Sequence, residues 1–445
     1  MKILLVQPKM NKRPMDTDLK TRMAPSLALL TLLNLTPPGG HETTIVNENV
    51  EKIDYDCGAE MVGITVTLDV MPRACRIAGE FMARGVPVVA GGIHVTCDPG
   101  ACLPHFSAIC VGPAERVWAK IVADAKAGVL QRVYCDMDGF RGDEIASPLY
   151  GGVEPKNYLY TNVVTTSRGC PNRCSFCYNS CDNRIYARRP VDAVIADIKA
   201  LGTRHVLFVD DNFIGDPKYA FELLNKLRGM RLHWSAAVTA SIIDCPELLD
   251  LMAATGCQSL FIGFESINAA SLASVNKDNK VAKYEELVEA IHSRGIMINA
   301  SMVFGLDGDE KHTFTRTLGW LVKMRIETLT SHILTPYPGT ELYRSMEAAG
   351  RIVERDLGKY NTSNVVFKPL GMTASELYIG YRRMYRQFYS FANIARRYPK
   401  NKAQRKAYLL FNLLYRKFGR VTSFAARIVP MGMLGRLAAK ISYDD

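Results

Sequence analysis

Residues 162–177 read Asn-Val-Val-Thr-Thr-Ser-Arg-Gly-Cys-Pro-Asn-Arg-Cys-Ser-Phe-Cys, so a β-branched run is followed at once by three closely spaced cysteines. Three thiolates on one tight loop at a strand end can bind three irons of a cubane cluster and leave the fourth iron open. With 12 cysteines in 445 residues, the spacing of Cys170, Cys174 and Cys177 arises by chance in about 0.01 of sequences. Zinc is the alternative, with Cys181 as a fourth thiolate, although zinc sites favour paired Cys-x2-Cys units.

The apolar pattern around this loop predicts a series of strand–helix units. The helical segments include Asp192–Leu201 and Ala220–Leu227. Six such units in about 190 residues suit a partial (β/α)6 barrel better than a second open sheet. The strands that we predict are Asn162–Thr166, Val206–Val209, Trp234–Val238, Leu260–Gly263, Ile298–Val303 and Thr328–Leu334.

The N-terminal part alternates short β-branched runs with amphipathic segments. Apolar strands separated by helical patterns indicate a parallel, doubly wound, Rossmann-like sheet. Glycines and prolines then accumulate and predict a linker. We therefore predict an α/β chain of four parts: a Rossmann-like domain (1–135), a linker (136–159), a barrel domain (160–367) and a helical region (368–445). The strands expected in the first part are Lys2–Val6, Glu42–Val46, Met61–Val66, Val86–Ala90 and Ala108–Val111.

The cysteine loop resembles the cluster motif of the radical S-adenosylmethionine (radical SAM) superfamily, and the resemblance extends over residues 155 to 365. It implies that Cys170, Cys174 and Cys177 hold a 4Fe–4S cluster whose open iron is chelated by the amino and carboxylate groups of SAM. Phe176 would pack on the adenine. Cys181 has no role in the family pattern, so we interpret it as a structural residue.

Other strand ends agree with this resemblance, although each alone could be turn chemistry. Many members have Gly-Gly-Glu where the methionine amino group is held, whereas the cobalamin-associated branch resembles Asp210-Asp211-Asn212 of this chain. Glu265 and Ser266 follow the fourth strand, where a polar side chain of the family reaches the SAM ribose. Together the candidates fall on the rim where barrel sites form. The predicted SAM-binding residues are Phe176, Asp210, Asp211, Asn212, Glu265, Ser266, Gly305, Asp307 and Thr335.

The first domain lacks a Gly-x-Gly-x-x-Gly after its first strand, which argues against a nicotinamide or flavin dinucleotide. Its strands end instead in the small residues of Gly91–Thr96 and Gly112–Glu115, which leave room for a bulky ligand across the carboxyl edge. This layout resembles the cobalamin-binding domain of one radical SAM branch, with Thr65–Asp69 as a third loop. The resemblance implies cobalamin contacts from Thr65, Thr67, Leu68, Gly91, Gly92, His94, Gly112 and Glu115.

The Asp-x-His-x-x-Gly motif that supplies a histidine to cobalt in many cobalamin proteins is absent from the chain. Cobalamin would therefore bind without a histidine ligand, or the domain has lost the cofactor. His94 belongs to the Gly-Gly-x-His-x-Thr turn of the family, and we predict a local hydrogen bond for its side chain. The alternative for the whole domain is a Rossmann-like fold that binds nothing.

The positive charge is concentrated at the C-terminal end. The chain is 48% hydrophobic with a formal net charge of +11, yet the first 370 residues are nearly neutral. No stretch reaches the roughly 18 apolar residues that span a bilayer. The C-terminal region could form a basic amphipathic helix that lies on anionic lipids. Equally, it could form a helical cap that packs on the barrel. We expect a cytoplasmic protein, peripheral to the inner face of the membrane, because Ile3–Val6 is too short for a signal peptide.

The resemblance implies a cobalamin-dependent radical SAM enzyme, specifically a methyltransferase. A 5′-deoxyadenosyl radical would remove hydrogen from an unactivated carbon, which then takes a methyl group from methylcobalamin. The full-length sequence most resembles the branch that contains hopanoid methylases and bacteriochlorophyll-pathway enzymes. This resemblance favours a lipid or tetrapyrrole substrate. A flavodoxin or ferredoxin would supply electrons, and nucleic acid is not expected to bind. The alternatives are a cobalamin-dependent cyclase or rearrangement enzyme and a non-catalytic cobalamin-responsive protein.

Overall fold

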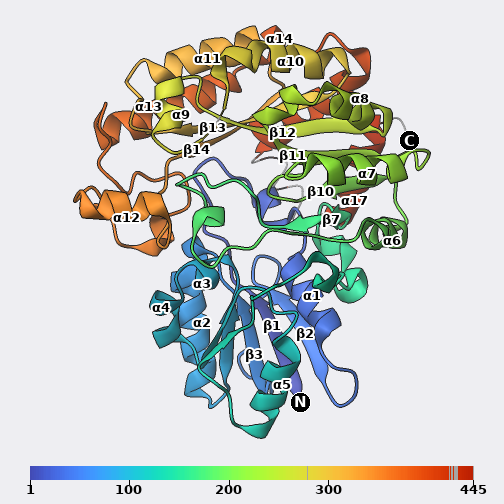
Figure 1. The fold of residues 1–445 in the computed structure, drawn as a ribbon, viewed down its shortest axis with the longest axis vertical. Coiled ribbons are helices and arrows are strands. Elements are labelled where there is room, and N and C mark those ends of the chain that lie inside the picture. Colours follow the sequence, from blue (N-terminus) through green and yellow to red (C-terminus); the bar gives the residue numbers. More distant parts are fainter. Residues whose placement is uncertain (278, 420, 422–423, 425–428, 444–445) are drawn as a thin grey trace.

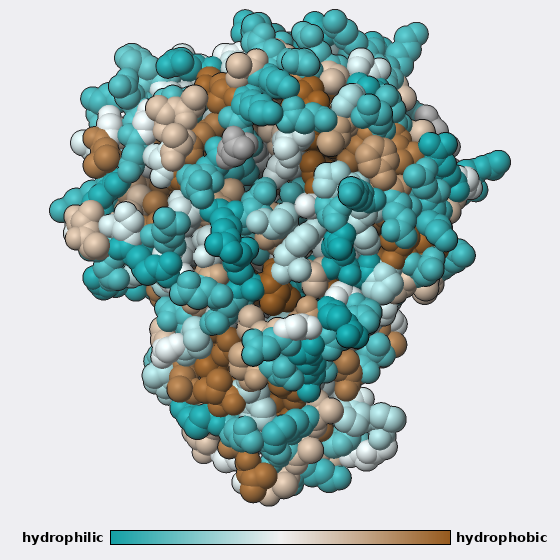
Figure 2. Space-filling view, viewed as in Figure 1, coloured by the Kyte–Doolittle hydropathy of each residue, from teal (hydrophilic) through white to brown (hydrophobic). Residues whose placement is uncertain are grey.

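The computed structural model describes residues 1–277, 279–419, 421, 424 and 429–443 of the chain. Two parallel sheets, each with its own helices, lie one above the other, and the C-terminal helices join the upper part (Figure 1). The surface seen in this view is mostly hydrophilic, with apolar patches of limited size (Figure 2). The predicted parallel α/β fold is confirmed.

The first sheet contains six parallel strands in the order β2-β1-β3-β4-β5-β6. Its strands are buried on both faces: Leu4 and Val6 of β1 pack beneath α2, whereas Ile3 and Leu5 pack beneath α1 and α5. The strands are β1 (Lys2–Gln7), β2 (Glu42–Asn47), β3 (Met61–Thr65), β4 (Val88–Gly91), β5 (Ala108–Val111) and β6 (Val133–Cys135). The surrounding helices are α1 (Leu27–Leu35), α2 (Met71–Ala83), α3 (Ile93–Cys97), α4 (Pro99–Cys102) and α5 (Trp118–Ala127).

The strand order of this sheet places a ligand site at its carboxyl edge. The chain leaves β1 toward β2 on one side and returns to β3 on the other. In doubly wound sheets a crevice opens outside the carboxyl ends of the strands where the order reverses. The site is therefore expected above β1 and β3.

The second sheet has the order β14-β13-β12-β11-β10-β7, all parallel, and its described strands form one linear series. Its strands are β7 (Val163–Val164), β10 (His205–Phe208), β11 (His233–Thr239), β12 (Cys257–Glu265), β13 (Met297–Phe304) and β14 (Thr328–Ile333). Its helices are α6 (Val191–Leu201), α7 (Pro217–Leu227), α8 (Pro246–Ala254), α9 (Ala269–Ala273), α10 (Tyr284–Ser293), α11 (Thr313–Lys323) and α12 (Glu341–Ala348).

A short antiparallel pair, β8 (Ser167–Arg168) and β9 (Ala187–Arg188), encloses the cysteine loop. This pair was not predicted from the sequence. Residues 169–186 therefore form one loop whose two ends are paired. This pairing lies next to the first strand of the second sheet.

The C-terminal helices pack on the edge of the second sheet. Tyr381 of α13 donates a hydrogen bond to the Ser331 carbonyl at 3.0 Å, and Tyr389 donates to the Leu329 carbonyl at 2.9 Å. These helices are α13 (Ala374–Phe388), α14 (Phe391–Arg396), α15 (Arg405–Leu409), the π-helix η12 (Leu410–Lys417) and α17 (Met431–Tyr443). Within the described ranges, no helix is both long and apolar enough to cross a bilayer.

Candidate active site

The middle of the cysteine loop is anchored by hydrogen bonds to the second domain. The Ser175 amide donates to the Val275 carbonyl at 3.1 Å, and the Leu342 amide donates to the Ser175 carbonyl at 3.1 Å. Asn276 donates from Nδ2 to the Arg173 carbonyl at 3.2 Å. The loop is therefore fixed against two segments of the second domain.

The three predicted cluster ligands lie within electrostatic reach of one another. Burial raises the pKa of Cys170 and Cys174, and burial together with the neighbouring Asp211 and thiols raises the pKa of Cys177 to about 11. Among the described residues, no three His, Cys, Asp or Glu side chains are placed to ligate a single metal ion. A cubane cluster requires no such arrangement, because each thiolate binds a different iron.

Cys181 lies apart from this group and contacts the first domain. Its thiol is hydrogen-bonded to the thiol of Cys97, and Cys97 also donates to the Tyr178 carbonyl at 3.6 Å. Asn183 donates to the Thr96 carbonyl at 2.9 Å. The second half of the loop thus joins the two domains, in keeping with a structural role for Cys181.

The segment after β10 presents acceptors toward the loop. Oδ1 of Asp210 accepts hydrogen bonds from the amides and hydroxyls of Thr166 and Ser167 at 2.6–3.1 Å. Oδ2 of Asp210 and Oδ1 of Asn212 are buried and have no hydrogen-bond partner in the described part of the chain. Asp211 accepts from Asn179 at 3.1 Å. Buried acceptors without donors fit an ammonium group, such as the amino group of SAM.

Glu265 and Lys277 form a buried ion pair beside the cysteines. Glu265 ends β12 with φ of 62° at a register shift, and its carboxylate lies 3.3 Å from Nζ of Lys277 and 3.3 Å from the Ser301 hydroxyl. Burial alone lowers the pKa of Lys277, but Glu265 and Cys174 raise it above the ordinary value. Lys277 was not among the predicted site residues, because one sequence does not show which lysine is buried.

The remaining predicted SAM residues lie at the strand ends and differ in their hydrogen-bond partners and in their burial. Asp307 is bound by Arg351 at 2.6 and 3.0 Å, and the Thr335 hydroxyl donates to the Ile333 carbonyl at 3.1 Å. Gly305 has φ of 95°, and its amide donates to Asp309 at 2.9 Å. Ser266 is buried, and Phe176 is half-buried against the core. Their roles toward SAM stay predictions.

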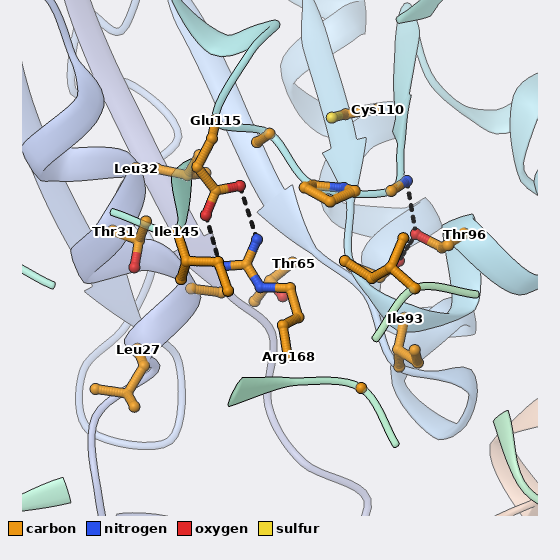
Figure 3. A pocket seen from close by; sticks show the side chains of 18 of the residues that line it. Leu27, Thr31, Leu32, Thr65, Ile93, Thr96, Cys110, Glu115, Ile145 and Arg168 are labelled. Atoms are coloured by element: carbon orange, nitrogen blue, oxygen red, sulfur yellow. Dashed lines mark hydrogen bonds and ion pairs between the residues drawn. The ribbon is translucent and has the colours of Figure 1, made fainter. Parts of the chain in front are cut away.

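A cavity of about 390 Å³ lies between the carboxyl edge of the first sheet and the base of the cysteine loop (Figure 3). The first domain contributes the predicted cobalamin residues Thr65, Gly91, Gly92, Gly112 and Glu115; Thr67, Leu68 and His94 do not line the cavity. The second domain contributes, among others, Ser167, Arg168, Tyr178, Asp210 and Asp211. The candidate cofactor segments of both domains therefore face one space.

An ion pair crosses this space. The side chain of Glu115 is buried; its Oε2 accepts a hydrogen bond from the guanidinium of Arg168 at 2.7 Å, and its Oε1 lies 2.6 Å from the same guanidinium as an ion pair (Figure 3). Arg168 precedes the first cluster cysteine by two residues. The position of the cysteine loop is thus coupled directly to the edge of the first sheet.

The predicted hydrogen bond of His94 is wrong. Its side chain is fully buried, both ring nitrogens are without a hydrogen-bond partner in the described chain, and burial lowers its pKa to about 4. Gly92 has φ of 112°, and a Cβ there would lie 2.8 Å from the Val66 carbonyl. This turn is therefore dictated by close packing on the end of the third strand, where the His94 amide donates to the Val66 carbonyl at 3.2 Å.

The loop after β1 carries a charged cluster that reaches β14. Arg13 contacts Nδ1 of His332 at 3.2 Å, and its guanidinium pairs with Asp16 at 3.1 Å. Lys20 pairs with the same carboxylate at 3.0 Å. This cluster was not predicted from the sequence, because Arg13 and His332 lie 319 residues apart along the chain.

We expect His332 to make the protein less stable on acidification. Burial, and then the charges of Arg13 and Lys20, lower its pKa from 6.5 to about 3, while Asp16 acts in the opposite sense. The unfolded state therefore takes up a proton first, and stability present above pH 6.5 is lost as the pH falls toward the folded-state pKa. Between pH 7 and pH 5 the loss from this group is about 2 kcal/mol. Urea unfolding of wild type and His332→Gln measures it; equal pH dependence in both would contradict the assignment.

Comparison with known proteins identifies the class. Residues 164–321 match the family model of the radical SAM superfamily, and residues 340–437 match a domain of unknown function, DUF4070. The cysteine loop and the polar strand ends at Asp210–Asn212, Glu265 and Asp307 therefore lie in the segment that matches the radical SAM superfamily, and the chain carries a radical SAM domain.

Relatives along most of the chain narrow the assignment. The bacteriochlorophyllide d C-12(1)-methyltransferase of Chlorobaculum tepidum is 29% identical over 409 residues, 89% of each chain. The hopanoid C-2 methylase of Rhodopseudomonas palustris is 29% identical over 367 residues, 77% of this chain and 68% of that protein. The TsrM methyltransferase of Kitasatospora setae, solved with cobalamin and a 4Fe–4S cluster, shares the fold: TM-score 0.67, 16% identity, 96% and 99% coverage of the two chains. These similarities support the family of cobalamin-dependent radical SAM methyltransferases.

Proposed function

We propose that this protein is a cobalamin-dependent radical SAM enzyme that methylates an unactivated carbon. The cavity between the two domains carries the proposal, because methyl donor and methyl acceptor must meet next to the cluster. The named relatives methylate a bacteriochlorophyllide and a hopanoid. We infer a hydrophobic substrate of the same kind, and electrons from a flavodoxin- or ferredoxin-like donor.

In this proposal Cys170, Cys174 and Cys177 hold the cluster. The buried acceptors of Asp210 and Asn212 would take the ammonium of SAM, and their lack of donors supports this. Glu265 would accept from the ribose and Lys277 would meet the methionine carboxylate. When bound, cluster and SAM supply reductive cleavage of the sulfonium, and cobalamin supplies the methyl group. The chain's own task is to orient these groups in a water-poor space.

The first domain, with its Rossmann-like sheet, would hold cobalamin, and the second would be the partial barrel. Thr65, Gly91, Gly92, Gly112 and Glu115 line the cavity and are the proposed contacts. No histidine is among the described residues of its lining, which supports binding without a histidine on cobalt. The proposed limits of these parts are 1–135 and 160–367.

The test is anaerobic incubation of the reconstituted enzyme with methyl-labelled SAM, cobalamin, a low-potential reductant and chlorophyllide-type or hopanoid substrates. Label in the product together with deoxyadenosine is expected. Deoxyadenosine with an altered but unlabelled product would instead favour the cyclase alternative. Cobalamin binding without deoxyadenosine would favour the non-catalytic alternative.

We further propose that the C-terminal region touches anionic membrane surfaces. Phe418 and Phe424 are 44% and 65% exposed, and Lys417 lies over the ring of exposed Phe391 at 4.7 Å. Exposed rings among basic side chains suit the interface of a bilayer.

We expect the wild-type protein to sediment with vesicles that contain phosphatidylglycerol and to bind pure phosphatidylcholine about tenfold more weakly. The Phe418→Ser/Phe424→Ser variant should lose binding to both. The matched control is Val129→Ser, which changes a residue that is 63% exposed on the first domain. Equal binding of wild type to the two vesicle types would contradict the electrostatic part of this prediction.

A further inference from the structure

The lining of the interdomain cavity contains an arginine whose charge has no partner in the described part of the chain. The charged residues of this lining are Glu115, Arg168, Arg184, Asp210 and Asp211. Arg168 is paired with Glu115, and the carboxylates of Asp210 and Asp211 accept hydrogen bonds from neighbouring residues. Arg184 is half-buried and makes no hydrogen bond, ion pair or ring contact with any described residue. Its guanidinium is therefore available to a ligand of this cavity.

An unpaired guanidinium favours a particular kind of ligand. A half-buried cation loses part of its hydration and gains from an anion that replaces the lost water. The planar fork of an arginine stays charged in proteins, and its donors match the oxygens of a carboxylate or of a phosphate in two parallel hydrogen bonds. The ligand of the cavity is therefore expected to carry an oxyanion beside Arg184.

The backbone on both sides of Arg184 is fixed by the fold. Asn183 donates from Nδ2 to the Thr96 carbonyl at 2.9 Å. On the other side, the Ile185 carbonyl packs on Gly169, which has φ of 79°, so closely that a Cβ there would lie 1.9 Å from the oxygen. An arginine on a fixed backbone loses less conformational freedom when it binds a ligand than one on a mobile loop.

These contacts place Arg184 next to the carboxyl edge of the first sheet. Thr96, which binds Asn183, follows β4, and its hydroxyl accepts from the Gly112 amide at the end of β5 at 3.0 Å. Gly92 and Gly112, with φ of 112° and 80°, line the same cavity as Arg184. Both glycines are proposed cobalamin contacts, and their lack of side chains leaves the edge open to a bulky ligand. The available guanidinium therefore lies on the cobalamin side of the cavity.

Cobalamin offers an oxyanion of the required kind, because its nucleotide tail contains a phosphodiester, whereas its amide side chains are neutral. We propose that Arg184 binds this phosphodiester. The inference rests on the proposed role of the first domain in holding cobalamin, and it adds a contact from the loop that carries the cluster cysteines. Cobalamin would then be held by both domains.

The experiment measures the dissociation constants of hydroxocobalamin and of cobinamide, which lacks the phosphodiester and its nucleotide, by equilibrium dialysis. The protein is the full chain with its cluster reconstituted anaerobically and without corrinoid. We expect Arg184→Met to bind hydroxocobalamin about tenfold more weakly than wild type, the factor that one charge-assisted hydrogen bond supplies. Its affinity for cobinamide should equal that of wild type. Arg184→Lys should lose less affinity for hydroxocobalamin, because a cation remains.

Arg76→Met is the matched control. Arg76 is exposed on α2 of the first domain and is outside the cavity lining, so both dissociation constants should stay at their wild-type values. Thermal unfolding without corrinoid should be the same for wild type and Arg184→Met, because Arg184 has no partner among the described residues to lose.

An equal loss of affinity for both corrinoids in Arg184→Met would overturn the proposal, and so would unchanged binding of hydroxocobalamin. SAM binding, measured on the same samples, should be unaffected. A loss confined to SAM would assign Arg184 to the methionine carboxylate and would also overturn the proposal. Wild type that binds neither corrinoid refutes the role of the first domain itself, whereas wild type that binds both, with no cobalamin-specific loss in Arg184→Met, refutes only the phosphodiester contact.

Discussion

Cys174→Ala is expected to abolish SAM cleavage. Each of the three loop thiolates would bind a different iron. Loss of one thiolate therefore leaves one iron without its protein ligand and exposes the cluster to water. Deoxyadenosine formation under strong reductant should fall by at least about 1,000-fold, as when one member of an interdependent catalytic unit is deleted. Iron and sulfide content of the anaerobically purified protein, together with deoxyadenosine by mass spectrometry, measures the effect.

Cys181→Ala is the matched control for this prediction. Cys181 belongs to the same loop but is hydrogen-bonded to Cys97 of the first domain. The variant should keep its iron, its sulfide and its SAM cleavage. Loss of metal in Cys181→Ala with full retention in Cys174→Ala would reverse the ligand assignment and revive a zinc-type site.

Lys277→Met is expected to have the second largest effect. It removes the cation between Glu265 and the cysteines and leaves a carboxylate buried beside anionic sulfur. Breaking a buried ion pair on one side costs about 3–5 kcal/mol, and SAM cleavage should fall by about 100-fold because a preorganised charge at the site is lost. Thermal unfolding and equilibrium binding of SAM separate the two contributions.

The double variant Lys277→Met/Glu265→Gln distinguishes stability from function. Replacing the carboxylate by a neutral amide removes the uncompensated charge, so most of the lost stability should return. SAM affinity should stay low, because neither the cation nor the ribose acceptor is restored. Lys277→Arg should retain both. If Lys277→Met binds SAM with wild-type affinity, Lys277 has only a structural role.

The strands and the cysteine loop could be predicted because their signals are local. A β-branched run, a tight cysteine spacing and small residues at strand ends can each be recognised within ten residues. Even so, β7 spans only Val163–Val164, shorter than predicted. The Thr166 amide is hydrogen-bonded to Asp210 rather than to a strand, and the Thr166 carbonyl accepts from the Arg189 amide at 2.9 Å.

Contacts between distant segments could not be predicted from one sequence. Lys277 and Arg13 resemble ordinary surface residues, and only the fold shows that their charges are buried. The His94 prediction failed for the same reason: the turn was recognised, but the packing that surrounds it is set by a neighbouring strand end. Local patterns indicated which segments form the candidate site, whereas the charges that complete it come from tertiary structure.

The packing of Leu19 against Met431 and Leu434 has a consequence for biosynthesis. A ribosome releases Leu19 hundreds of residues before its partners exist, so the nascent first domain cannot bury the loop after β1. During synthesis, Leu19 therefore stays without these two partners until the last helix, α17, has been translated.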